Sequence, residues 1–170
     1  MVDRVVNVST VIQANFTRPS NTTAYAAGDA VTDSTSAPSI LTFTGCARNI
    51  GYSGVITNAV LLDSANVATK GSFELWLWDT TVTPDNDNAV FTPTDAENRT
   101  LVGVIPFTLS YVGDATSGAD GNAIYLGTMT QPIPFVTQTT ANLFGELVVR
   151  NAYTPVSAER FDIRLFIDQN

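Results

Sequence analysis

Residues 85–97, DNDNAVFTPTDAE, hold the densest group of side chains that could bind a cation. Asp and Asn alternate at the start of this stretch, as they do in a helix–loop–helix calcium loop. Such a loop also needs a ligand at its fifth position, Gly at its sixth and Glu at its twelfth. Counting from the first Asp, these positions hold Ala89, Val90 and Ala96. The spacing argues against this motif, so we interpret the acids as turn residues and surface charge, with an irregular calcium loop as the alternative.

The second half of the stretch predicts a short helix near 93–99. Thr92 suits the N-cap, and Pro93 suits the first helical position because its missing N–H is not needed there. Two acids follow in the first turns, where the helix dipole favours negative charge. Phe91 is expected to pack back onto Ala96 as a hydrophobic staple.

Catalysis has few candidate residues in this chain. Glycoside hydrolysis needs two carboxyl groups, one of them desolvated, and only Glu74 and Glu146 lie on strands that look central. Each is expected at an outward position, which favours a structural role. Histidine is absent, so a serine nucleophile has no imidazole base, and the single cysteine, Cys46, is expected to be a small buried residue. We expect no enzyme, no catalytic residue, no cofactor and no metal site.

Trp76 and Trp78 project to the same side of the expected strand 73–79, FELWLWD. Adjacent aromatic rings can stack on sugars, but tryptophan more often packs in a core or an interface. We favour packing, and keep a carbohydrate-binding module as an alternative function.

The net charge of −8 argues against nucleic acid, because phosphate binding depends on clustered Lys and Arg. An acidic surface instead suits solubility or docking on a basic protein partner. No segment approaches the ~20 apolar residues that cross a bilayer, and no secretion signal is recognisable. We therefore expect no membrane partner and synthesis in a cytoplasm.

Short apolar runs separated by turn-forming clusters predict a single all-β domain over residues 1–170. We expect an antiparallel β-sandwich, jelly-roll-like fold or barrel of about 8–10 strands. The clearest strand, 160–168, alternates apolar and charged residues, whereas 73–79 and 143–150 are apolar on both faces and are expected to be covered on both sides. Further strands are expected near 10–17, 23–32, 39–44, 54–62, 101–109, 123–128 and 132–137.

Residues 1–18 alternate only weakly, so they form either a first strand or an arm that reaches a neighbouring molecule. An arm would survive deletion without loss of the fold. The candidate interaction residues are the two tryptophans named above and four residues of this segment: Arg4, Val5, Phe16, Arg18, Trp76 and Trp78.

Four stretches together resemble a group of small structural proteins of tailed bacteriophages that are often encoded close to the major capsid protein. They are AYAAGDAV (24–31), GVITNAVLLDSANVATKGSFELWLWD (54–79), NAVFTPTDAENRTLVGVIPF (88–107) and LFGELVVR (143–150). The resemblance implies a virion component without enzymatic activity, and carries no functional motif that transfers residue by residue.

Within that group, the resemblance implies a capsid decoration (cement) protein that binds the outer surface of the head. Its partners would be the major capsid protein and itself, with a homotrimer favoured over a homodimer. The two-faced strands could pack against sister subunits, and the N-terminal segment could add a strand to the capsid protein. A tail or baseplate component of the same kind of particle is a further alternative.

Overall fold

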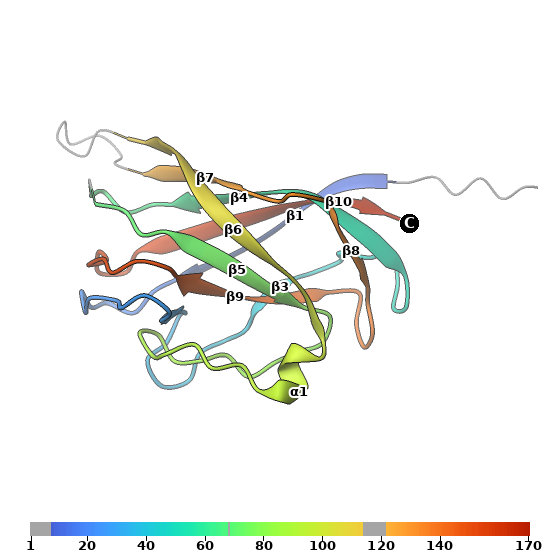
Figure 1. The fold of residues 1–170 in the computed structure, drawn as a ribbon, viewed down its shortest axis with the longest axis horizontal. Helices are drawn as coiled ribbons and strands as arrows, with labels where there is room; N and C mark the ends of the chain where they lie inside the picture. The colour runs from blue at the N-terminus through green and yellow to red at the C-terminus, as the bar shows by residue number, and fades with distance from the viewer. Residues whose placement is uncertain (1–7, 68, 114–121) are drawn as a thin grey trace, which may run out of the picture.

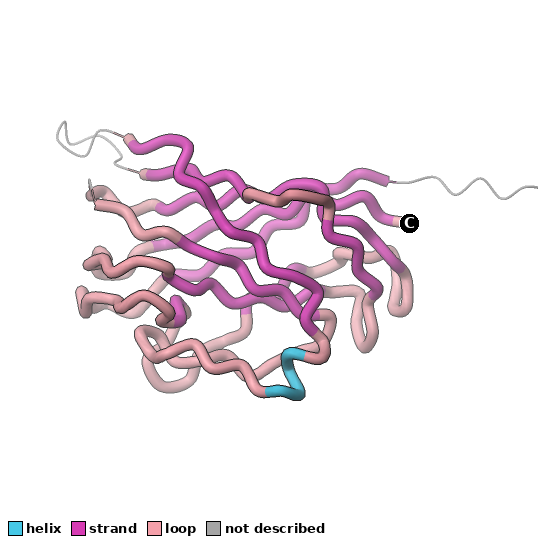
Figure 2. The backbone as a smooth tube through the Cα atoms, in the orientation of Figure 1, coloured by secondary structure: helices cyan, strands magenta, loops and turns pink. Residues whose placement is uncertain are grey.

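The computed structural model describes residues 8–67, 69–113 and 122–170, which form ten strands and one short helix (Figures 1 and 2). Every strand pairing is antiparallel. The elements are β1 (Val8–Thr17), β2 (Ala30–Val31), β3 (Leu41–Phe43), β4 (Ser53–Asp63), β5 (Phe73–Trp78), α1 (Asp95–Asn98), β6 (Leu101–Val112), β7 (Ala123–Gly127), β8 (Ile133–Val136), β9 (Leu143–Val149) and β10 (Arg160–Gln169).

The strands form one curled sheet in the order β1-β10-β4-β7-β6-β5-β9-β2, with β3 added to β9 and β8 added to β4. The long strand β6 joins the two halves, because its first part pairs with β5 and its second part pairs with β7. Figure 1 shows β6 passing from one half of the sheet to the other. The sheet thereby becomes a half-barrel whose concave side encloses the hydrophobic core, and the expected all-β fold is confirmed.

Strand β10 shows the alternation that the sequence predicts. Phe161, Ile163 and Leu165 are fully buried, whereas Arg160 and Arg164 are exposed. It lies between β1 and β4 and pairs with both over most of its length. Each apolar residue of β10 therefore packs into the core from a strand that neighbours hold on both sides.

Strands β5 and β9 are covered on both faces, as expected. Every residue of β9 is buried. Its concave face joins the core, and its outer face lies against the loop that follows β5, where the backbone N–H of Asp85 donates to Glu146 Oε1 at 2.9 Å. The cover on β9 therefore comes from the same chain, and no sister subunit is needed to bury it.

The helix is shorter than expected and begins at Asp95. Its N-cap is Thr94, so the assignment of this role to Thr92 is wrong. Thr94 is the N-cap because it forms a capping box with Glu97. Glu97 N–H donates to Thr94 Oγ1 at 3.3 Å, and Thr94 N–H donates to Glu97 Oε2 at 2.7 Å. The Thr94 N–H bond lowers the pKa of the Glu97 carboxyl.

The expected staple between Phe91 and Ala96 is replaced by an aromatic contact. The Phe91 ring lies 4.9 Å from Trp76 and 6.3 Å from Trp78. Two large rings bury more of Phe91 than one alanine methyl group, which explains the difference.

The expected strand over 23–32 is reduced to the two residues of β2. Tyr25 makes only an isolated bridge with Tyr153. Gly28 then adopts a φ of +97°, in the region that favours glycine, and this interrupts the extended backbone.

Residues 8–17 are the first strand of the sheet, which is one of the two alternatives for the N-terminal segment. They pair with β10 along their whole length. Residues 1–7 lie outside the described part of the chain. Deletion of residues 1–18 would remove β1, so we now expect this deletion to unfold the domain rather than to spare the fold.

Leu165→Asp is expected to unfold the domain, because the fully buried Leu165 would be replaced by a charge without a partner. A loss of more than about 4 kcal/mol is the expected scale. Far-ultraviolet circular dichroism and thermal melts measure it. Val90→Asp is the matched control, because Val90 is 67% exposed and should melt like the parent protein. A folded Leu165→Asp protein with an unchanged melting temperature would contradict the core assignment.

Candidate functional site

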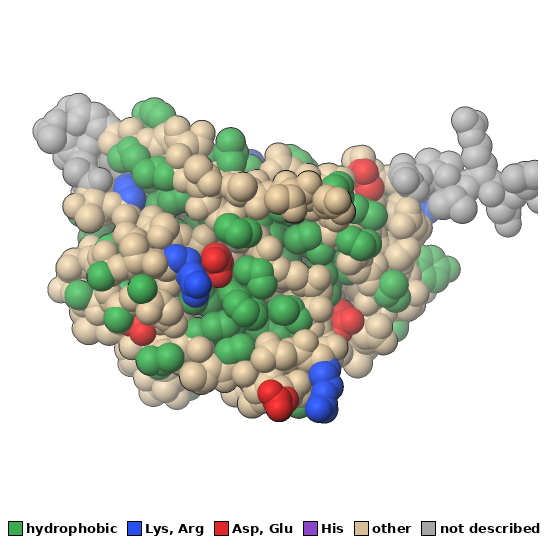
Figure 3. Space-filling model, viewed as in Figure 1, with side chains coloured by type: hydrophobic (Ala, Val, Ile, Leu, Met, Phe, Trp, Pro, Cys, Tyr) green, Lys and Arg blue, Asp and Glu red, His purple; other side chains and the backbone are tan. Residues whose placement is uncertain are grey.

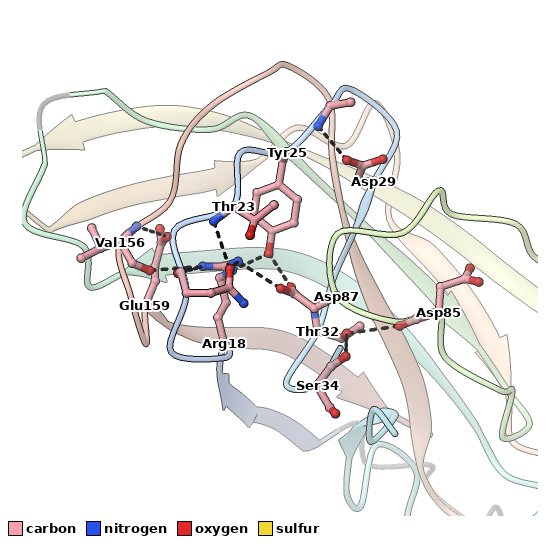
Figure 4. A network of polar contacts seen from close by, with 12 residues as sticks. Arg18, Thr23, Tyr25, Asp29, Thr32, Ser34, Asp85, Asp87, Val156 and Glu159 are labelled. Atoms are coloured by element: carbon pink, nitrogen blue, oxygen red, sulfur yellow. Dashed lines mark hydrogen bonds and ion pairs between the residues drawn. The ribbon is translucent and has the colours of Figure 1, made fainter. Parts of the chain in front are cut away.

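A buried ion pair joins three distant segments at one end of the half-barrel (Figure 4). Arg18 follows β1 and places its Nη2 at 3.0 Å from Asp87 Oδ2, with both side chains fully buried. Tyr25 bonds with both partners: its hydroxyl accepts from Arg18 Nε and donates to Asp87 Oδ1. Asp87 also accepts from the backbone N–H of Thr32 at 3.2 Å. This network ties the loop after β5 to β1 and to the segment around β2.

The acids of residues 85–97 therefore have structural roles that the sequence did not reveal. The interpretation of Asp87 as surface charge is wrong, because it is buried and paired with Arg18. Asp85 accepts the backbone N–H of Thr92 at 2.8 Å and so closes the turn. No group of three or more His, Cys, Asp or Glu in the described residues is arranged to hold a metal ion.

Asp87→Ala is expected to cost about 3–5 kcal/mol of the free energy of unfolding, because it leaves the Arg18 charge buried without a partner. Urea denaturation measures the change. Asp95→Ala, at an exposed position in α1, is the control and should cost less than about 1 kcal/mol. Equal effects of the two substitutions would mean that the ion pair does not hold the loop.

Two buried glutamates carry raised pKa values. Burial, together with the nearby Asp63 carboxylate, raises the pKa of Glu159 to about 9. Asp63 is itself held by Lys70, whose Nζ lies 3.1 Å away. Burial also raises the pKa of Glu146 to about 8, although the Asp85 N–H bond opposes the shift. Both glutamates are therefore mostly protonated at neutral pH.

Glu74 and Glu146, the candidate catalytic pair, occupy different environments. Glu146 lies on the outer face of β9, as expected, but the loop after β5 covers it and keeps it from solvent. Glu74 is only half-buried and lies 3.4 Å from Arg150. The register aligns Glu74 with Val148 and Trp76 with Glu146, which gives each carboxyl its own neighbours across the sheet.

The stability of the protein is expected to fall as the pH rises from about 4.5 towards about 9. Glu159 has a pKa of about 9 in the folded protein and 4.5 as an ordinary glutamate, so the folded state binds its proton more tightly. Its stabilising contribution is fully present below pH 4.5 and is lost as the pH passes through 9. Glu146 acts in the same direction.

Glu159→Gln is therefore expected to flatten the pH dependence of the melting temperature and to melt above the parent protein at pH 9. Glu74→Gln serves as the control, since Glu74 is half-buried at the surface. A parent protein that becomes more stable between pH 5 and 9 would rule out a protonated Glu159.

The tryptophans pack within the protein. Trp78 is 1% exposed, and its ring centroid lies 6.4 Å from that of the half-buried Trp76. Figure 3 shows hydrophobic side chains gathered on this face of β5 and β6, with charged side chains beside them. Because Trp78 is buried, the two rings do not form an open platform for a sugar. Cys46 is also fully buried, as expected, and burial raises the pKa of its thiol to about 12.

Of the candidate interaction residues, the four that the structure describes do not form one exposed surface. Phe16 is half-buried with its ring 5.4 Å from Phe161, and Arg18 is held in the buried network. Arg4 and Val5 lie outside the described residues.

A groove separates β1, one free edge of the curled sheet, from β2 and β3, which pair in succession with β9 at the other edge. It has a volume of about 300 Å³ and is lined by β1, by the segments around β2 and β3, and by β9. Gln13 and Asn15 line it on the β1 side, Thr42 on the β3 side, and Glu146 and Leu147 on the β9 side. The wall contains both polar and apolar side chains, which suits the alternating side chains of an extended peptide.

The outer edge of β1 presents free backbone groups. Just after β1, Arg18 N–H donates to Glu159 O, so this even-numbered position bonds towards β10. On the other side of β10, Ser64 N–H donates to Arg160 O, so the even-numbered residues of β10 bond towards β4. Because hydrogen-bonding direction alternates along an antiparallel strand, the even-numbered residues of β1 bond to β10. The remaining residues direct N–H and C=O away from the sheet: Ser9, Val11, Gln13, Asn15 and Thr17. In the described chain no strand pairs with this edge.

The sequence of this edge lacks the residues that usually protect against strand addition. Its ten residues, VSTVIQANFT, contain no proline and no charged residue, and the pairing with β10 has no register shift. Natural edge strands are usually shielded by lysine, proline or a bulge. The edge of β1 is therefore the candidate functional site, and its chemistry is backbone hydrogen bonding to an added strand. The lack of charge in β1 can be read from the sequence, but only the sheet topology shows that β1 is an edge strand.

Comparison with known proteins returned no match to any family model, and no curated protein matches the chain. No helix in the described part of the chain has the length and apolar character needed to span a bilayer.

Proposed function

We propose that the protein is a non-enzymatic structural component of a bacteriophage virion, a decoration protein that binds the outer surface of the capsid. The observation that carries the proposal is the uncharged edge of β1, with which no strand of the described chain pairs. The resemblance of four stretches to small structural proteins of tailed phages supports the particular setting. The proposed partners are the major capsid protein and further copies of the chain in a homo-oligomer.

Attachment would proceed by strand addition. An extended segment of the capsid protein pairs with the free backbone groups of β1, such as those of Val11 and Gln13. Alternate side chains of that segment then enter the groove between β1 and β3. Backbone pairing supplies affinity, and the groove supplies specificity.

Stabilisation of the shell follows from the linkage between binding and capsid integrity. A protein that binds the assembled shell but not its separated subunits adds its binding free energy to the stability of the shell. The domain is suited to this role because its core spans both halves of the curled sheet. The net charge of −8 keeps it soluble before it binds, and also directs it towards basic surfaces.

Purified protein is expected to co-sediment with assembled capsids and to raise their resistance to heat or osmotic shock. Absence of binding to intact shells would overturn the proposal. Electron microscopy of labelled virions locates the protein on the head, and labelling of the tail or baseplate instead would favour the alternative position.

Val11→Pro is expected to abolish capsid binding while leaving the fold intact. Val11 is 52% exposed, and its N–H points away from β10, so proline removes a donor that only an added strand would use. Val11→Thr keeps both the N–H and the branched side chain and serves as the control. Co-sedimentation measures binding, and circular dichroism verifies folding. Normal binding by a folded Val11→Pro protein would show that β1 does not carry the contact.

A further inference from the structure

A second unpartnered surface lies on the outer face of β10, β4, β7 and β6. Its centre is an apolar strip in which the register brings side chains from three neighbouring strands together. The exposed members of the strip are Tyr111, Ile124 and Leu126. The half-buried members are Val60 and Leu62. Exposed apolar side chains that adjoin across strands are characteristic of contact surfaces.

The strip is hollowed where it meets β10. A depression of about 320 Å³ is lined by Val60, Leu62 and Ile124 together with the charged Asp162 and Arg164. The register places Asp162 beside Leu62 and Arg164 beside Val60. A row of charges therefore borders the apolar strip on one side.

The charges of this face balance one another, unlike those of the whole chain. The outward row of β10 carries Arg160, Asp162, Arg164 and Asp168, two cations and two anions, whereas the chain has a net charge of −8. The outward positions of β1, β4 and β7 add no charged residue. Two copies of so acidic a protein repel each other, so self-association requires a face without excess negative charge. This face meets that requirement.

We propose that the protein forms a twofold homodimer through the outer face of β10, β4 and β7. The dimer specifies the homo-oligomer of the proposed function, and it rests on the proposed function only for that self-association. The apolar strip of one subunit packs against the same strip of a second copy of the chain. Capsid binding through the edge of β1 is a separate property.

The arrangement of the charges makes the face complementary to itself. A twofold axis that crosses the strands at the level between Asp162 and Arg164 places Asp162 opposite the partner's Arg164, and Arg164 opposite the partner's Asp162. The same axis places Leu62 opposite the partner's Val60 on β4. On β7 it places Ile124 opposite the partner's Leu126. Apolar side chains thus meet apolar side chains, and Asp162 and Arg164 each meet the opposite charge.

This geometry favours a dimer over the trimer that the resemblance implies. A surface that is complementary to itself under a twofold axis is fully buried in a closed dimer. A trimer instead requires two different contact surfaces on each subunit. The edge of β1 borders this face without forming the apolar strip, so it stays available to a capsid segment.

Sedimentation equilibrium of the full chain, measured without capsids, tests the proposal. The parent protein is expected to form a dimer at micromolar concentration. Ile124→Glu places an acid in the strip and is expected to raise the dimer Kd by at least about tenfold, which corresponds to about 1.4 kcal/mol. Tyr111→Glu, at a more exposed position, is the second variant if Ile124→Glu misfolds. Val90→Glu, away from this face, is the control and should dimerise like the parent.

A charge exchange tests the axis itself. Arg164→Asp alone should weaken the dimer, because the new carboxylate faces the partner's Asp162. Combining it with Asp162→Arg restores opposite charges across the axis, so the double variant should dimerise more tightly than Arg164→Asp. Failure of this rescue would overturn the proposed axis.

A monomeric or trimeric parent protein, or an unchanged dimer in folded Ile124→Glu, would overturn the dimer itself. Those outcomes are distinct from failure of the proposed function: a monomer that binds capsids removes only the dimer, and a dimer that does not bind capsids removes only the decoration role.

Discussion

Burial of the Arg18–Asp87 ion pair constrains most of this fold. Removing both charges from water is costly, so the arrangement persists only because Tyr25 and the backbone of Thr32 complete the hydrogen bonds. The partners are 69 residues apart in the chain, and their contact sets where the loop after β5 must run. That loop then covers the outer face of β9. One interaction at the end of β1 thus determines which surface of the second half-sheet is closed to solvent.

The covered face also decides which surfaces remain for partners. Because β9 and much of β5 are buried within the chain, neither two-faced strand is free to meet another subunit. Two other surfaces stay open, the backbone edge of β1 and the apolar strip centred on β4 and β7. They differ in chemistry, since one offers hydrogen-bonding groups and the other offers side-chain area. The two proposed contacts use different surfaces, so neither would compete with the other.

The sequence predicts what depends on local alternation and misses what depends on distant contacts. The pattern of β10 is visible in its residues, and so are the two covered faces of β5 and β9. The helix start was misplaced by two residues because Thr92 and Thr94 are both good caps, and only the bond to Glu97 separates them. Asp87 looked like a turn residue because its partner Arg18 lies far away in the chain. The burial of Arg18 and Trp78 was missed for the same reason, because it depends on segments that local patterns do not place.

The position of β10 between β1 and β4 has a consequence for how the chain reaches its structure. Among the described strands, β1 pairs only with β10, which is synthesised about 150 residues later, so β1 lacks that partner while the ribosome makes the intervening chain. Contacts this distant in sequence are slow to form, and unpaired strands are prone to aggregation. Productive folding therefore waits until β10 is made. A cell that makes many copies at once holds many nascent chains with an exposed β1 and β4, so yield should depend on synthesis rate and temperature.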